Sequence, residues 1–378
     1  MLDGQRQIRI TSKSSINAEQ ENFLLYDQLE QDELLPPTWG NVPTHRESGS
    51  LPDFTNGGIV VFYHIYKTGG STVGKLFHEL AEDDQKQYDV DKTKKNNNIA
   101  DSMLSPSRLF FTMIRKSIDW KKDCLATLYM AERKKKLILL ELHVEHPAPD
   151  FPSLVELAPI LDRWRAEADR RGVGFFAFTL VREPVAHALS FFNFFHVGNN
   201  KGRPIPSRKD HDYWNPFKPL RSSEENFLRS YYANNRQCRM LNSDPQATYA
   251  APQDLVWNET LVSKKQVTES HQPCPIDKVH NALFDSLDWV GTTENLQNET
   301  LPLLTKLVAN DPSVGRNNAP FKVFDNNPNG PRGMKKYDLS DNTLSAILER
   351  TRLDRGLYAD VVRDFTLADL GWDYKSVK

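Results

Sequence analysis

A single stretch, residues 58–72, reads GIVVFYHIYKTGGST and decides the fold. Its first half is an unbroken apolar run rich in β-branched and aromatic side chains, which is typical of a strand buried on both faces. Its second half is a glycine turn, and a helical pattern follows from Thr72 to about Leu80. Strand, glycine loop and helix in this order predict one βα unit of a parallel sheet.

The rest of the chain continues this alternation. We expect strands at residues 137–143, 173–181 and 287–291, and helices at 153–171, from 183 onward, at 223–241, from Thr292 or Thr293 to about Val308, and at 341–365. Strands that alternate with helices predict an α/β layer fold with a mainly parallel sheet. We expect a polar, loosely ordered N-terminal arm at residues 1–56 and one folded domain at 57–378, with a Lys- and Asn-rich surface insertion near 82–101.

Composition limits the classes of partner. The net charge of −2 gives no whole-protein argument for binding nucleic acid or a membrane. No apolar run approaches the roughly 18–20 residues that span a bilayer, and the N-terminus lacks a signal-peptide core. As it stands the sequence predicts a soluble chain, with a lost N-terminal anchor as the open alternative. Cys124, Cys238 and Cys274 can form at most one disulfide, and the pairing stays open.

The glycine turn has the composition of an anion site. Gly69 and Gly70 allow the backbone to approach an anion closely, and the helix start directs unpaired N–H groups at it. Thr68, Ser71 and Thr72 supply hydroxyl groups, and Lys67 supplies a positive charge. The lysine precedes the glycines, so the spacing of a nucleoside triphosphate loop is absent. The alternative is a capped turn with an incidental lysine.

The motif His-Ile-x-Lys-Thr-Gly-Gly-Ser-Thr also resembles the 5′-phosphosulfate loop of the Golgi carbohydrate sulfotransferases. It is most similar to that of the heparan sulfate 2-O- and 6-O-sulfotransferases. This resemblance implies a P-loop-like, three-layer α/β fold with a central, mainly parallel sheet flanked by helices. It implies 3′-phosphoadenosine-5′-phosphosulfate as the sulfuryl donor, with no metal, and a donor site that includes residues 67–72.

A second segment carries the same resemblance. The family's Arg-Asp-Pro-Val-x-Arg-x-x-Ser element holds the 3′-phosphate of the donor, and Arg182 and Ser190 match its ends at the same spacing. Glu183 and His187 depart from the pattern, and His187 replaces a usual arginine. Taken alone, a strand-end arginine before a proline-started helix is also consistent with a surface charge. Three further segments, at 233–241, 289–294 and 353–358, match the 6-O-sulfotransferases in chain order.

Sulfuryl transfer needs a cation at the leaving phosphate and a base for the acceptor hydroxyl. We expect Lys67 to be the cation. His143 ends the expected strand 137–143 and is our candidate base, because the 6-O-sulfotransferases place a catalytic histidine in a similar Leu-His context. His146 is the alternative base, and Glu141 or Glu145 could orient either ring. We expect His64 to pack under the loop in a structural role.

The acceptor implied by the resemblance is a heparan-like or other acidic polysaccharide. Its predicted contacts are His196 and the basic residues Arg332, Lys335 and Lys336, with a further basic cluster at Lys201, Arg203, Arg208 and Lys209. Such clusters are also consistent with solvated surface.

The family's compartment is the Golgi lumen. Sequons at Asn258 and Asn298 fit that location. Two competing functions stay open: a P-loop kinase or NTPase, and a non-catalytic glycan-binding relative of the fold.

Overall fold

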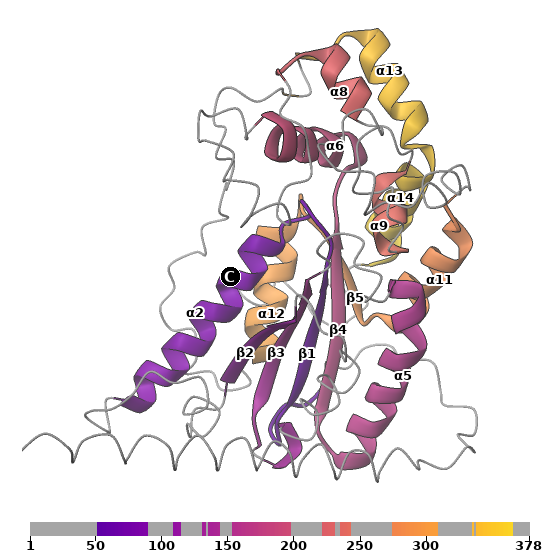
Figure 1. Cartoon of the computed structure of the whole chain (residues 1–378). Coiled ribbons are helices and arrows are strands. Elements are labelled where there is room, and N and C mark those ends of the chain that lie inside the picture. Colours follow the sequence, from indigo (N-terminus) through magenta and orange to yellow (C-terminus); the bar gives the residue numbers. More distant parts are fainter. Residues whose placement is uncertain are drawn as a thin grey trace, which may run out of the picture.

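A computed structural model of the chain describes residues 51–89, 109–114, 131–133, 135–143, 153–197, 221–230, 235–242, 274–308, 335 and 338–365. Its centre is a five-stranded sheet with the order β2-β3-β1-β4-β5, in which every pair of neighbours is parallel (Figure 1). The strands are β1 (Gly58–His64), β2 (Leu109–Ile114), β3 (Leu137–His143), β4 (Gly174–Val181) and β5 (Trp289–Thr292). The predicted α/β fold with a parallel sheet is confirmed.

Helices cover both faces of this sheet. On one face lie α2 (Gly70–Asp89) and α12 (Leu301–Val308), and on the other lie α5 (Leu154–Arg171) and α11 (Ile276–Ser286) (Figure 1). All seven residues of β1 are buried. Alternate side chains of β1 enter two separate hydrophobic cores, one under each helical layer. This two-sided burial explains why the β1 sequence is apolar without alternation.

A third group of helices lies beyond the carboxyl end of β4. It comprises α6 (Pro184–Phe192), α8 (Glu224–Ser230) and α13 (Asp341–Arg350), which share a small apolar core of their own (Figure 1). The π-helical turn η1 (Asn193–Val197) continues α6. Two further helices, α9 (Arg236–Leu241) and α14 (Arg352–Asp364), pack against each other beside β5.

The α5 helix follows the prediction closely. Ser153 is its N-cap and forms a capping box with Glu156. Gly172 ends it in the left-handed conformation, with φ of 66°. A residue with a Cβ adopts this conformation at a cost, so a glycine C-cap is the favoured solution.

Other boundaries differ from the prediction. Strand β2 was not predicted, so residues 137–143 form the third strand of the chain and not the second. The expected helix at 223–241 is two helices, because Asn235 adopts φ of 53° immediately before α9. The expected helix at 341–365 is also two, α13 and α14, which are separated at Thr351. The helical segment after β5 begins at η6 (Leu296–Thr300) and continues as α12.

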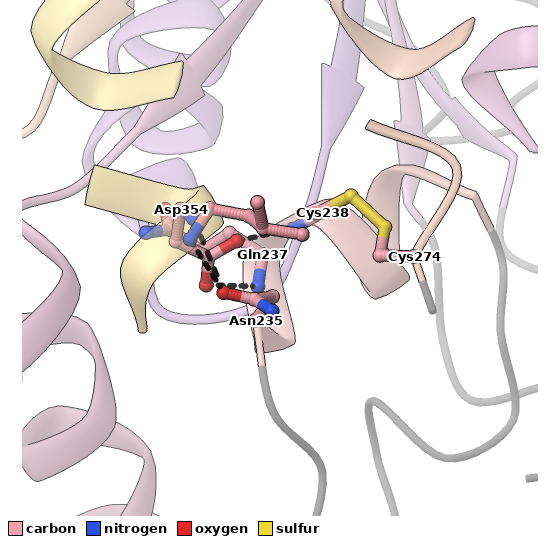
Figure 2. The surroundings of a disulfide bond; sticks show 6 residues. Asn235, Gln237, Cys238, Cys274 and Asp354 are labelled. Carbon is pink, nitrogen blue, oxygen red and sulfur yellow. Dashed lines mark hydrogen bonds between the residues drawn. A yellow bond between two sulfur atoms is a disulfide. The ribbon is translucent and has the colours of Figure 1, made fainter. Parts of the chain in front are cut away.

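A disulfide links two segments in the second half of the chain. Cys238 on α9 is bonded to Cys274, which lies just before α11 (Figure 2). Cys124 lies outside the described residues. A cross-link across 36 residues restricts the unfolded chain and is worth about 4 kcal/mol in the chain-entropy treatment. Among the described residues, no helix is long and apolar enough to cross a bilayer.

Two glycines allow β1 and β4 to start in close contact. A Cβ at Gly58 would lie 2.2 Å from the carbonyl oxygen of Gly174, which is backbone and cannot rotate away. Phe54, within the range expected to be an arm, is fully buried, and its ring occupies the space over Gly174.

We therefore expect Gly58→Ala to lower the free energy of unfolding by about 1–3 kcal/mol or more through overpacking. Gly356→Ala is the matched control. Gly356 lies in α14, and a Cβ added there would meet nothing within 4 Å, so alanine should stabilise by about 1 kcal/mol. Urea unfolding of the two variants measures the difference, and equal midpoints would contradict the close contact of the strands.

Candidate functional site

The sheet order makes the carboxyl ends of β1 and β4 neighbours. These strands are neighbours, but β1 leads through α2 towards β2 at one edge, and β4 leads towards β5 at the other. Ligands of open α/β sheets bind where the connections that leave two adjacent strands run to opposite sides in this way. The predicted anion loop follows β1 and Arg182 follows β4. The fold therefore brings together the two segments that the sequence singled out.

The loop after β1 turns sharply into α2. Lys67 and Gly69 adopt φ of 66° and 97°. The buried hydroxyl of Thr68 donates to the carbonyl of Ile65 at 3.0 Å and closes the turn. Because α2 begins at Gly70, the first N–H groups of this helix lack an intrahelical acceptor and carry the positive end of its dipole. This geometry is suited to an anion.

A buried ion-pair geometry supports the loop from below. His64 Nδ1 lies 2.7 Å from Glu141 Oε1, and both side chains are almost fully buried. The ring of His64 lies directly beneath Gly70, since a Cβ at that position would be 1.8 Å from Nε2. The second glycine of the motif is therefore required by packing as well as by any ligand. His64 packs under the loop as predicted, and it contacts Glu141, a pairing that was not predicted.

Arg182 is held against the loop by its backbone and its side chain. Its Nη1 donates to the carbonyl of Lys67 at 3.1 Å. Gln237, which is buried, accepts from the N–H of Arg182 at 2.8 Å and donates to its carbonyl at 2.7 Å. The side-chain amide of Gln237 thus forms hydrogen bonds with both the N–H and the C=O of Arg182, just after the end of β4, as the backbone of a neighbouring strand would. Gln237 is a structural component of the site that its sequence context did not reveal.

Gln237 is fixed in turn by two helices that cap each other (Figure 2). Asn235 Oδ1 accepts from the N–H groups of Leu353 and Asp354 at the start of α14, at 2.9 and 3.3 Å. Asp354 accepts from the N–H groups of Gln237 and Cys238 at the start of α9, at 3.0 and 2.9 Å. Each helix thus receives its N-terminal acceptor from the other. Burial raises the pKa of Asp354 to about 6.

The α6 helix contacts the loop from above. His187 is fully buried, and its Nε2 donates to the carbonyl of Tyr66 at 2.9 Å. Burial, together with the neighbouring positive charges of Arg236, Arg182 and Lys67, lowers the pKa of His187 to about 3. His187, which replaces an arginine of the motif that this segment resembles, is therefore a neutral hydrogen-bond donor.

The segment after β5 closes the other side. The hydroxyl of Thr293 donates to the carbonyl of Thr68 at 2.8 Å. Glu294 accepts from the N–H of Glu183 and, at 3.1 Å, from the hydroxyl of Tyr358. Burial, and then the negative charge of Glu294, raise the pKa of Tyr358. The segments at 233–241 and 289–294 thus contact Arg182 and the loop directly, through Gln237 and Thr293. The segment at 353–358 contacts these two segments, through Asp354 with Gln237 and through Tyr358 with Glu294.

Some of the remaining predicted residues are described by the structure, and the others lie outside the described residues. His143 ends β3, and its Cα pairs with that of His64 in the parallel register. Ser190 is half-buried on α6, whereas His196 is fully buried on η1 with its ring 5.8 Å from that of Phe192. Lys335 is exposed. His146, Glu145, Arg332, Lys336 and the cluster at 201–209 lie outside the described residues.

Comparison with known proteins gives no assignment. No protein-family model matches the sequence, and no curated protein matches it significantly. In the described part of the chain, no group of three or more His, Cys, Asp or Glu side chains is placed to hold a metal ion.

His187 gives this site a testable pH dependence. The unfolded chain binds a proton at this imidazole below about pH 6.5, whereas the folded chain does not until about pH 3. The contribution of His187 is thus complete above pH 6.5 and is lost as the pH falls. When the pH is lowered from 7 to 5, we expect the free energy of unfolding of the wild type to fall by roughly 2 kcal/mol more than that of His187→Gln.

Guanidinium unfolding at several pH values measures this difference. His78→Gln, on an exposed part of α2, is the control and should follow wild type. A difference between wild type and His187→Gln that does not change with pH would show that His187 is not buried as a neutral ring.

Proposed function

We propose that this protein is a sulfotransferase that moves a sulfuryl group from 3′-phosphoadenosine-5′-phosphosulfate to a hydroxyl of a polysaccharide. The observation that carries the proposal is the contact between Arg182 and the loop at Lys67, at 3.1 Å, at the carboxyl ends of β1 and β4. The donor carries two anionic groups on one adenosine. A loop at a helix start and an arginine from the next strand offer two adjacent anion sites in a P-loop-like arrangement.

The chemistry follows from the charges. The acceptor oxygen attacks sulfur as the bond between sulfur and the bridging oxygen of the 5′-phosphate breaks, and the acceptor proton passes to a base. Negative charge grows on the leaving phosphate, so a fixed cation beside it lowers the barrier. Lys67 is the cation in this proposal and His143 the base. The end of β3 lies beside the start of the loop, which favours His143 for this role.

A polysaccharide acceptor and a luminal compartment extend the proposal. The disulfide between Cys238 and Cys274 favours an oxidising compartment. Asn298, in one of the two sequons, is exposed. Both are consistent with the Golgi lumen. In this proposal the acceptor is an acidic, heparan-like glycan, and exposed basic residues such as Lys335 bind it.

The donor assignment predicts selective stabilisation by the nucleotide product. Near 100 times its dissociation constant, 3′-phosphoadenosine-5′-phosphate should stabilise the fold by about 2.7 kcal/mol, whereas ATP with magnesium should not. Lys67→Ala and Arg182→Ala should each reduce the shift in melting temperature. Lys278→Ala, at an exposed position on α11, should retain it.

A thermal-shift titration measures these effects. Stabilisation by ATP with magnesium alone would overturn the sulfotransferase proposal in favour of a kinase or NTPase. Equal shifts in Arg182→Ala and Lys278→Ala would remove Arg182 from the donor site.

The base is tested separately. We expect His143→Ala to lower the rate of transfer by about 10²–10⁴-fold while nucleotide affinity changes little, because a general base acts in the chemical step. Transfer of labelled sulfate to a panel of desulfated glycans measures this. Retained turnover would assign the base elsewhere, with His146 as the next variant.

A further inference from the structure

The η1 turn places an aromatic ring on the loop lysine. The Nζ atom of Lys67 lies 3.9 Å from the centroid of the Phe194 ring. This distance is well within the range in which an ammonium group is attracted to the negative face of an aromatic ring. Lysine has a long, flexible side chain, so a fixed partner restricts where its charge can be.

Phe194 is held in this position by its neighbours. Phe192 and His196 are fully buried and Asn193 is almost so, which anchors the turn on both sides of Phe194. Phe194 itself is 40% exposed. Among the described residues, Phe194 and Val362 are the two large hydrophobic residues that are exposed. Core packing therefore does not account for a phenylalanine at this position.

The contact also belongs to a larger arrangement. The continuous segment from the end of β4 through α6 to η1 touches the loop three times. Arg182 donates to the carbonyl of Lys67, His187 donates to the carbonyl of Tyr66, and Phe194 receives the ammonium of Lys67. The first two contacts fix the backbone of the loop, and the third fixes the charge that this backbone carries.

We propose that Phe194 is a positioning residue that holds the ammonium of Lys67 ready for the leaving phosphate. The inference rests on the proposed function, because it assigns the use of the same lysine. An ammonium group has three N–H donors, and an aromatic face engages only one side of it. A phosphate oxygen can approach the same ammonium from another side, so in this proposal the ring orients Lys67 and does not take the place of the donor nucleotide.

The test measures binding of 3′-phosphoadenosine-5′-phosphate by calorimetry, together with kcat and KM for transfer. Phe194→Leu should weaken binding and lower kcat by about two- to fivefold each, the range expected of an exposed cation–π contact. Phe194→Tyr and Phe194→Trp should restore both values. Val362→Ala, at the other exposed hydrophobic position, should match wild type. Because the Phe194 side chain is partly exposed, none of these changes should lower the melting temperature appreciably.

A double-mutant cycle separates positioning from a general effect. In a Lys67→Met background, Phe194→Leu should cause no further loss of binding. An equal further loss, or tighter binding by Phe194→Leu in the native background, would overturn the role of Phe194. Wild-type protein that fails to bind the nucleotide would overturn the proposed function itself, and with it this use of Lys67.

Discussion

The candidate site depends on the pairing of one buried amide with the backbone of Arg182. Gln237 satisfies both main-chain groups of this arginine at 2.7 and 2.8 Å, just after β4 ends. A buried backbone group without a partner costs about 1–3 kcal/mol, so this pairing determines which path the chain takes out of the sheet. That path sets the direction of the guanidinium, which reaches the loop at Lys67. Helices α9 and α14, through their mutual caps, act on the loop by way of this amide.

Local signals in the sequence were sufficient for much of the fold. The unbroken apolar run of β1, the glycine turn and the helical spacing of α5 each depend on residues close in sequence, and each was predicted. The strand β2 was missed, because a short apolar run of six residues carries no periodicity that distinguishes it from a buried helix segment. The break between α8 and α9 was also missed, since the left-handed conformation of Asn235 is compensated by contacts with α14.

The candidate site was predictable only in part. Lys67 and Arg182 stood out because glycines and a proline mark their surroundings. The contacts that hold them join residues far apart: His64 and Glu141 are 77 positions apart, and Gln237 and Arg182 are 55 apart. A sequence read along its length shows the members of such pairs but not the pairing. The exposure of Phe194 within an aromatic run was hidden for the same reason, because it depends on how the η1 turn packs.

The exchange of caps between α9 and α14 has a consequence for the order in which the molecule can be completed. Asp354 accepts from the N–H of Gln237, which lies 117 positions earlier, and neither short helix has a side-chain cap of its own. During synthesis the whole sheet is made before Asp354 leaves the ribosome. Leu357 and Val361 of the same helix also belong to the hydrophobic core on the α5 side of the sheet. The support of Gln237, and through it of Arg182, is therefore completed together with this core, as a late step that awaits the C-terminal helix.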